Sequence, residues 1–316
     1  MSEPDLALRV SNLVVGARRP DGPAPVRGVD LRARSGESIA IVGESGAGKS
    51  LTGMAILSLL PDPLVRRAGT VEIAGRELSP TLPRRTLASY ATLVPQDPLS
   101  AFNPVRTVGS LFREVLARHR GGAGGRAYQD VMRATLADLG LPDPDAVLAC
   151  YPHQLSGGMR QRVLIGFALA IDAPVLVADE PTTALDSTIQ RQILELLRVQ
   201  GRDGRTLLLI THDLGVVAEL CDRVYVMYAG RVVEEGPTER VVEAPRHPYT
   251  QGLLRALPRV GTDRLEVAGI PGQPPDVTDV SAGCSFAARC PRAADKCGER
   301  PQLVGDGHRV ACWRPL

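Results

Sequence analysis

Aromatic residues, lysine and long hydrophobic runs are all scarce in this chain of 316 residues. Only 3% of the residues are aromatic, so few side chains can stack on bases. The net charge is only +2, so nucleic-acid binding is not expected. The nearest approach to a long apolar run, 163–178, is broken by Asp172 and Pro174 and is too short to span a bilayer. Residues 1–13 carry acids and no apolar segment of a signal peptide. We therefore expect a cytosolic protein. If it works at a membrane, partner proteins must hold it there.

Lysine is nearly absent, since Lys49 and Lys296 are the only lysines among 37 basic residues. Lys49 ends a glycine-rich loop between the apolar run Ser38–Val42, which predicts a buried strand, and a helical pattern at 50–60. The loop comprises Gly43, Glu44, Ser45, Gly46, Ala47, Gly48, Lys49 and Ser50. Such a loop cradles phosphate, because its backbone N–H groups and the helix dipole face the anion. Lys49 would reach the β and γ phosphates and the Ser50 hydroxyl would bind Mg²⁺; the alternative is a turn with an incidental lysine.

Two acids and a histidine follow other predicted strands. Asp179 and Glu180 come directly after the apolar run 175–178, and His212 follows the apolar run 207–211. Ligands bind at the carboxyl ends of strands in parallel α/β sheets, so these side chains are candidates for holding a metal and a reacting water. By themselves, an Asp-Glu pair at a strand end also fits a solvated turn, and a single histidine fits a structural residue.

The chain resembles the nucleotide-binding subunits of ABC transporters over nearly its whole length, because six motifs occur in the order found in that family. They are the Walker A motif at 43–50, the Q-loop residue Gln96, the signature Ser156, Gly157 and Gly158, the Walker B motif ending at Asp179 with Glu180 beside it, the D-loop Ala184, Leu185 and Asp186, and the switch residue His212. The resemblance implies ATP hydrolysis with Glu180, His212 and Gln96 as catalytic residues. It also implies that Ser50, Gln96 and Asp179 hold Mg²⁺, and that the signature binds the γ-phosphate of an ATP on another subunit.

The implied fold is α/β, with a P-loop NTPase core built on a parallel sheet. Residues 1–245 would form the ATP-binding domain, which contains a helical subdomain at about 98–158, and residues 246–316 would form a small cysteine-rich C-terminal extension. One chain carries one Walker A motif and one signature, so a complete hydrolysis site requires a head-to-tail pair of such subunits.

Finer features resemble the oligopeptide, dipeptide and nickel importer branch of the family. These features are the runs at 156–162, 178–186, 247–250 and 270–275 and the cysteine-rich tail. Met159 in the signature resembles one member of a pair of ATPases, so the resemblance implies a heterodimer with a sibling ATPase. It further implies two transmembrane permease subunits, an extracytoplasmic solute-binding protein and a place at the cytoplasmic face of the membrane. A soluble ABC ATPase of DNA repair or translation, and a redox-sensing module that uses the cysteine tail, are the alternatives; the cargo stays open among peptides, nickel chelates and other solutes.

One position departs from the family pattern. Such ATPases place an aromatic residue near the end of the first strand to stack on adenine, and the corresponding residue here is Ala17. The guanidinium group of Arg18 or Arg19 is the candidate substitute, although loop arginines are more often solvated.

Four of the six cysteines lie in the tail, at Cys284, Cys290, Cys297 and Cys312. A cytosolic chain argues against disulfides, which leaves a [4Fe–4S] cluster, tetrahedral Zn²⁺ or free thiols. The tail resembles the iron–sulfur extension of some peptide-importer ATPases, which implies that the four cysteines ligate a [4Fe–4S] cluster. His308 keeps the zinc alternative open as a possible fourth ligand. Cys150 and Cys221 stand in apolar or helical contexts and are expected to be buried thiols.

Overall fold

The computed structural model describes residues 6–19, 22–119, 124–182, 185–202, 204–257, 269–278 and 282–316. A seven-stranded sheet forms the centre of the molecule, with the strand order β11-β10-β9-β3-β8-β7-β6. Its strands are β3 (Ser38–Val42), β6 (Ala91–Val94), β7 (Val175–Asp179), β8 (Thr206–Thr211), β9 (Arg223–Tyr228), β10 (Arg231–Pro237) and β11 (Arg309–Val310). The five strands from β9 to β6 run parallel, whereas β10 and β11 are antiparallel additions at one edge. The predicted α/β fold class is confirmed.

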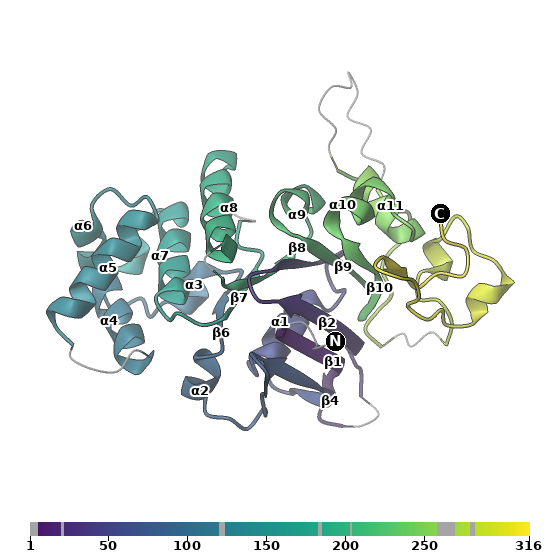
Figure 1. Cartoon of the computed structure of the whole chain (residues 1–316), viewed down its shortest axis with the longest axis horizontal. Helices are drawn as coiled ribbons and strands as arrows, with labels where there is room; N and C mark the ends of the chain where they lie inside the picture. The colour runs from purple at the N-terminus through teal and green to yellow at the C-terminus, as the bar shows by residue number, and fades with distance from the viewer. Residues whose placement is uncertain are drawn as a thin grey trace, which may run out of the picture.

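Continuous burial explains why the central strands are apolar throughout. Every residue of β3, β7 and β8 is buried, because a parallel sheet is covered by helices on both faces. Figure 1 shows α1 on one side of the sheet and α8, α9 and α10 on the other. These helices are α1 (Lys49–Ile56), α8 (Ser187–Arg202), α9 (Leu214–Leu220) and α10 (Thr238–Glu243).

A second, antiparallel sheet packs on the α1 side, with the order β2-β1-β4-β5. Its strands are β1 (Leu6–Ala17), β2 (Val26–Arg34), β4 (Leu64–Ile73) and β5 (Arg76–Glu77). The second half of β2 alternates buried and exposed residues, as expected of a strand with one face on the core. Its apolar face shares a core with α1 and the central sheet through Leu31, Ile39 and Ile56.

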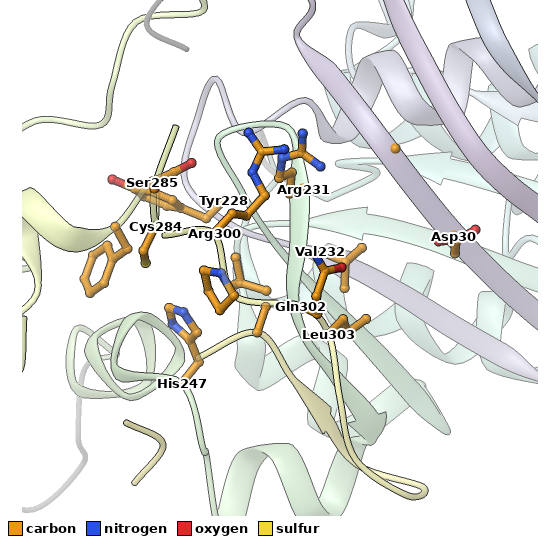
Figure 2. A pocket seen from close by; sticks show the side chains of 16 residues that line it. Asp30, Tyr228, Arg231, Val232, His247, Cys284, Ser285, Arg300, Gln302 and Leu303 are labelled. Carbon is orange, nitrogen blue, oxygen red and sulfur yellow. The ribbon is translucent and has the colours of Figure 1, made fainter. Parts of the chain in front are cut away.

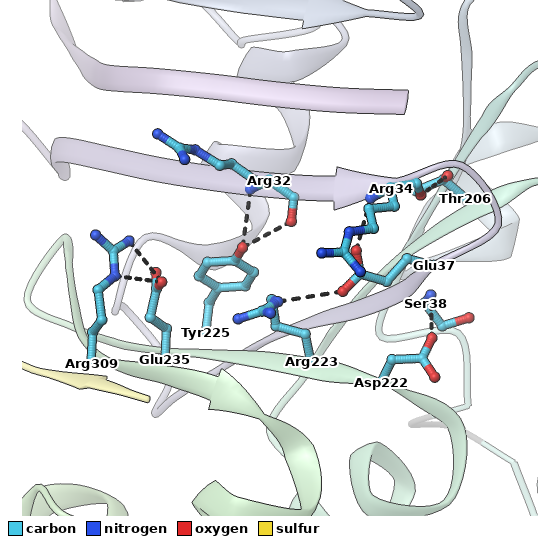
Figure 3. A network of polar contacts seen from close by, with 10 residues as sticks. All are labelled: Arg32, Arg34, Glu37, Ser38, Thr206, Asp222, Arg223, Tyr225, Glu235 and Arg309. Carbon is cyan, nitrogen blue, oxygen red and sulfur yellow. Dashed lines mark hydrogen bonds and ion pairs between the residues drawn. The ribbon is translucent and has the colours of Figure 1, made fainter. Parts of the chain in front are cut away.

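Polar contacts join the two sheets at one end (Figure 3). The hydroxyl of Tyr225 donates to the Arg32 carbonyl at 2.9 Å and accepts from the Arg32 N–H at 3.0 Å. Burial raises the pKa of Tyr225 to about 12, which keeps this hydroxyl protonated. Arg223 pairs with Glu37 at 3.3 Å. Each sheet therefore orients the other at the base of the strands.

A helical lobe stands at the left of Figure 1. It contains α3 (Pro98–Ala101), α4 (Val108–His119), α5 (Arg126–Asp138), α6 (Pro144–Ala149), the 3₁₀ turn Pro152–Gln154 and α7 (Gly157–Leu169); α2 (Arg84–Ala88) lies nearby. Phe112, Leu116 and Leu136 are fully buried between these helices. Residues 120–123, in the glycine-rich stretch between α4 and α5, lie outside the described residues. None of the helices that the structure describes is long and apolar enough to cross a membrane.

The segment after residue 245 lies at the end opposite the helical lobe (Figure 1). It begins with α11 (Pro248–Arg255) and continues through two 3₁₀ turns, Ala287–Arg289 and Asp295–Gly298. Its strand β11 then adds to β10, so the last residues of the chain extend the central sheet. Buried Glu234 of β10 accepts from the backbone N–H groups of Arg246 and His247, which anchors the start of the segment.

Candidate nucleotide-binding site

The glycine-rich loop connects β3 to α1 as the sequence predicted. Gly46 and Gly48 have φ angles of 82° and 98°, a region that favours glycine. A Cβ atom at Gly48 would lie 2.6 Å from the Pro25 carbonyl oxygen, so this position admits no other residue without displacing the backbone. The first turn of α1 has no side-chain cap. Its N–H groups therefore face the loop and are available to an anion, since helix N-termini leave such donors unsatisfied.

Lys49 is buried in this loop, with 6% of its surface exposed. Its Nζ atom donates to the carbonyl oxygens of Gly43 at 2.8 Å and Glu44 at 3.0 Å. Burial lowers the pKa of Lys49, and the carboxylates of Glu180, Asp179 and Glu44 counteract this effect. The ammonium group is thus a partly desolvated cation, and a phosphate beside it is attracted more strongly than it would be in bulk water.

A hydroxyl and a carboxylate meet beside this lysine. Ser50 Oγ donates to Asp179 Oδ1 at 3.0 Å, although 129 residues separate them. Asp179 is buried with 4% exposure, and its pKa is raised by burial and by Glu180, against the opposing effects of Ser50 and Lys49. Oxygen donors of this kind suit Mg²⁺. The residues present therefore fit the ion that the sequence predicted here.

Glu180 and His212 form the second pair. His212 Nδ1 lies 3.0 Å from Oε1 and 3.1 Å from Oε2 of Glu180. Glu180 has a φ angle of 45° and its N–H donates to the Ile210 carbonyl, so its side chain leaves the strand in a direction different from that of Asp179. Only 12% of the Glu180 side chain is exposed, whereas His212 is 57% exposed. The histidine therefore covers one side of the carboxylate and is placed to orient it.

Parallel pairing brings the separate motifs to one edge of the sheet. Val94 pairs with Ala178, Asp179 with Ile210, and Val42 with Thr211, so the segments after β6, β7, β8 and β3 all leave the same edge. Exposed Gln96 follows β6 at this edge. The structure thus gathers five predicted elements: the loop 43–50, Gln96, Asp179, Glu180 and His212.

The signature lies in the helical lobe, where Ser156 caps α7 by accepting from the Met159 N–H at 3.3 Å. Gly157 is exposed, and a Cβ atom there would meet nothing within 4 Å. α7 packs on β6 and on helices of its own lobe, whereas α1 packs on other strands. The signature and the glycine-rich loop of one chain are thus on different elements, and the signature faces outward.

The D-loop is partly described, because Ala184 lies outside the described residues. Leu185 donates its N–H to the Thr182 carbonyl. Asp186 accepts from the N–H groups of Thr188 and Ile189 at 3.1 and 3.0 Å, so it caps the start of α8.

No aromatic residue stands at the expected adenine position, since Ala17 ends β1. Its carbonyl accepts from Arg67 Nε at 2.7 Å. Arg18 pairs with Asp62 at 2.9 Å on the surface. The neighbouring cation most tightly bound to this turn is therefore Arg67, which the sequence analysis did not consider.

Two further residues that the sequence analysis did not assign to the site contact the glycine-rich loop. The hydroxyl of Tyr249, in α11, accepts from the Glu44 N–H at 2.7 Å. Arg289 pairs with the Glu44 carboxylate through both terminal nitrogens, at 2.6 and 3.0 Å. The run His247–Thr250 was noted only as a family feature, and no sequence pattern linked Arg289 to a residue 245 positions away.

The four tail cysteines lie near one another. Burial raises the pKa of the Cys284 thiol, and Cys297, Cys312 and Cys290 raise it further. The Cys284 N–H donates to the Cys297 carbonyl at 2.9 Å. Within the described residues, however, no three His, Cys, Asp or Glu side chains are arranged to hold a metal ion. The thiols are thus neighbours without ligand geometry.

His308 and the two cysteines outside the tail have other partners or environments. His308 Nε2 bonds Glu234 Oε1 at 2.7 Å, so its contact is with the central sheet and not with the cysteines. Cys221 is buried, as expected, and its pKa is raised; Cys150 is only half-buried.

A cavity of about 160 Å³ separates β2 and β10 from the tail (Figure 2). Arg231 and Arg300 lie close together there, and burial together with the charges of Arg300 and Arg27 lowers the pKa of Arg231 to about 10. None of the residues 43–50 lines this cavity. It is therefore distinct from the edge that gathers the motifs.

Comparison with known proteins agrees with this geometry. Residues 26–183 match the ABC transporter family, and residues 233–297 match the family described as "Oligopeptide/dipeptide transporter, C-terminal region". The dipeptide transport ATP-binding protein DppD of Escherichia coli is 44% identical over 306 residues, with 94% of this chain and 93% of that protein covered. The oligopeptide transport ATP-binding protein OppD of Salmonella typhimurium is 42% identical over 320 residues, with 99% and 95% covered.

Solved structures support the same fold. The dimeric bacterial ABC transporter cassette MJ0796 is 27% identical and superposes with a TM-score of 0.65, covering 73% of this chain and 98% of its own. A second structure of that cassette, in a dimeric post-hydrolysis state bound to ADP and phosphate, gives a TM-score of 0.64 at 26% identity. These matches give no support to a DNA-repair ATPase or a redox-sensing module. The chain belongs to the ATP-binding subunits of ABC transporters, within the oligopeptide/dipeptide importer family.

Proposed function

We propose that the edge where the motifs meet binds Mg²⁺ and ATP. Backbone N–H groups of the loop and the Lys49 ammonium would hold the phosphates, with the Gly43, Ser45, Gly46, Ala47, Gly48 and Ser50 positions forming the cradle. Glu44 belongs to the same loop, but its N–H donates to Tyr249 and its side chain is turned to Arg289. Ser50 and Asp179 would hold Mg²⁺, joined by Gln96. When bound, the ion neutralises negative charge on the phosphates. The observation that carries the proposal is the 3.0 Å contact between Ser50 and Asp179, because it places two oxygen donors beside a buried lysine.

The chemistry assigned to this chain is activation of a water molecule. Glu180 would accept a proton from the water that attacks the terminal phosphate, as the bond between that phosphate and ADP breaks. His212 would orient the carboxylate through Nδ1, which lies 3.0 Å away. A general base positioned in this way contributes typically 10²–10⁴-fold to the rate.

Binding measurements test the metal assignment. With fluorescent ATP, Asp179→Asn is expected to abolish most of the gain in affinity that Mg²⁺ gives to the unchanged protein, while binding in EDTA stays within about threefold. Asp145→Asn is the matched control, because Asp145 is an exposed acid that pairs with Arg133. Equal Mg²⁺ dependence in Asp179→Asn and the unchanged protein would refute the assignment.

A second nucleotide-binding subunit completes the site in this proposal. Ser156, Gly157 and Gly158 would present the N-terminus of α7 to the γ-phosphate on the opposite subunit. The outward position of the signature supports this arrangement, as does the dimeric state of the MJ0796 cassette. The second subunit would be a sibling ATPase. A disulfide cross-link tests the head-to-tail contact. One cysteine replaces Gly157 of this chain, another is placed at the position of the sibling ATPase that corresponds to Ser45, and the cross-link is expected to form in the presence of ATP.

The transported solute is proposed to be a peptide. Relatives that cover nearly the whole chain are named for dipeptide and oligopeptide transport, and the tail matches the family named for the same solutes. The subunit would sit at the cytoplasmic face of the membrane, held by two permease subunits and served by an extracytoplasmic solute-binding protein. Uptake of labelled dipeptides and longer peptides by cells that carry the intact gene or Glu180→Gln tests this; uptake that Glu180→Gln leaves unchanged would refute it.

The division of the chain is proposed to follow these roles. Residues 1–245 would form the ATP-binding domain, with 98–158 as the helical subdomain that contacts a permease near Gln96. Residues 246–316 would form the extension, although β11 is part of the central sheet.

We also propose that Cys284, Cys290, Cys297 and Cys312 hold a [4Fe–4S] cluster with a structural role. The support is their proximity, since each of the other three thiols affects the pKa of Cys284, and the donor set, since four thiolates are the usual ligands of such a cluster. The absence of ligand geometry among the described side chains means that the thiols must turn inward on binding.

Anaerobic purification tests the cluster. The protein is expected to be brown and to contain about four iron atoms and four sulfides per chain. Replacing any one of the four cysteines with serine should remove the colour, whereas Cys221→Ser should not. Colourless protein with one equivalent of zinc would assign the site to zinc, and metal-free protein would refute both.

A further inference from the structure

Arg289 reaches from the cysteine-rich extension into the glycine-rich loop. It ends the 3₁₀ turn Ala287–Arg289, directly before Cys290. Its Nη1 and Nη2 atoms donate to Oε2 and Oε1 of Glu44 at 2.6 and 3.0 Å. Only 5% of its side chain is exposed, against 27% for Glu44. This is a two-point, largely desolvated ion pair, the geometry in which an arginine and a carboxylate hold each other most rigidly.

The remaining donors of Arg289 are also occupied. Nε donates to the Pro271 carbonyl at 2.8 Å, and Nη2 also donates to the Ile270 carbonyl at 3.2 Å. The guanidinium group lies 5.9 Å from the Tyr228 ring centre and 6.0 Å from that of Phe286. Glu44, through its charge and hydrogen bonds, raises the pKa of Arg289, so the group is always a cation. Its direction is therefore set by the extension before it meets Glu44.

The extension also holds the backbone of the same residue. The Glu44 N–H donates to the Tyr249 hydroxyl at 2.7 Å, and Tyr249 is fully buried. Its ring packs on Tyr228 and Phe286, at 4.6 and 5.4 Å between ring centres. The main chain and the side chain of Glu44 are thus both bonded to residues after 245.

Charge gives this contact a consequence for nucleotide binding. Glu44 is a carboxylate in a loop that binds a polyanion, and its charge acts on Lys49. Without Arg289, that negative charge would repel the phosphates and compete with them for Lys49. An interaction between two charges within the protein persists over several ångströms, because the effective dielectric constant is about 20. Neutralising Glu44 therefore favours ATP at the neighbouring positions.

We propose that Arg289 is a positioning residue of the nucleotide site: it fixes the first turn of the glycine-rich loop through Glu44 and cancels the carboxylate charge beside the phosphates. In this proposal, the extension contributes directly to the nucleotide site. This inference rests on the assignment of 43–50 to phosphate binding.

A double-mutant cycle tests the proposal, with equilibrium binding of Mg·ATP to the full chain as the readout. Arg289→Gln leaves the Glu44 charge exposed and is expected to raise the Kd about tenfold at 50 mM salt. The loss should shrink as salt is raised, because salt screens the repulsion. Adding Glu44→Gln should restore the Kd to within about threefold of the unchanged protein. Arg309→Gln is the matched control: it removes an ion pair with Glu235 that also ties the extension to the sheet, and it should leave the Kd unchanged.

Each other result contradicts a specific part of the reasoning. If Arg289→Gln binds ATP normally while Lys49→Ala does not, the positioning role is wrong and the nucleotide site stands; if Lys49→Ala also binds normally, the site assignment itself is wrong. If Glu44→Gln does not rescue Arg289→Gln, the arginine acts by docking the extension and not by charge. If Arg289→Gln does not fold, Glu44→Gln alone decides: it should bind ATP within threefold or more tightly, and a tenfold loss would overturn the proposal.

Discussion

Glu180→Gln is expected to stop ATP hydrolysis while leaving ATP binding intact. The substitution keeps the size and shape of the side chain. The glutamine carbonyl oxygen can still accept from His212 Nδ1, which lies 3.0 Å from Oε1 of Glu180 in the unchanged protein. The backbone N–H of residue 180 still donates to the Ile210 carbonyl. What disappears is the carboxylate that accepts a proton.

The size of the effect follows from that loss alone. Removal of a positioned general base lowers a rate by roughly 10²–10⁴-fold, which corresponds to about 3–5 kcal/mol in the activation barrier. Folding should change little, because the bond to exposed His212 becomes a neutral one and costs on the order of 1 kcal/mol. Binding of Mg·ATP should stay within about threefold, since Lys49, Ser50 and the loop N–H groups are untouched.

The assay is phosphate release by the assembled transporter, together with ATP binding by the isolated chain. Glu195→Gln is the matched control, because Glu195 is an exposed acid of α8 whose ion pair is with Arg198. Turnover of Glu180→Gln within threefold of the unchanged transporter would refute the role of Glu180. A loss of ATP binding equal to the loss of turnover would instead place Glu180 among the binding residues.

Four further outcomes are expected. Lys49→Ala should weaken ATP binding at least tenfold by isothermal titration, because it removes the buried cation of the loop; unchanged affinity would contradict the phosphate cradle. Phe286→Ala should destabilise the extension by about 3–5 kcal/mol and expose it to protease, because the ring is 2% exposed and packs on three others. Burial lowers the pKa of His247 to about 4, so neutral His247 contributes its full stability above pH 6.5. As the pH falls from 6.5 toward 4, the free energy of unfolding measured by urea titration should decrease by roughly 3 kcal/mol, because the unfolded chain takes up the proton first. His247→Gln should remove this pH dependence. GTP should compete with labelled ATP within about threefold, because Ala17 offers no ring to adenine; a tenfold preference for ATP would reveal another stacking residue.

The strands and the motif order were predictable because their signals are local. The runs 38–42 and 175–178 are apolar without interruption, as buried parallel strands require, and the glycine-rich loop needs its φ angles within a few consecutive residues. Once these strands pair in parallel, Asp179, Glu180 and His212 must emerge at the edge that carries the loop. The sequence therefore contained the fold class and most of the residues that gather at this edge.

Contacts between distant segments were decided only by tertiary structure. The sequence left His308 open as a ligand in the zinc alternative, but the fold places it on Glu234. It gave Arg289 no role, but the fold bonds it to Glu44 across 245 residues. It also placed a boundary at residue 245, after which β11 returns to the central sheet. A pair of single charged or polar side chains leaves no period or spacing in a sequence. The path of the backbone decides which two side chains meet, and burial favours those that satisfy each other's hydrogen bonds. Local patterns thus predicted the residues that we propose bind and react with a nucleotide, and only the folded chain showed that the extension is bonded to the glycine-rich loop.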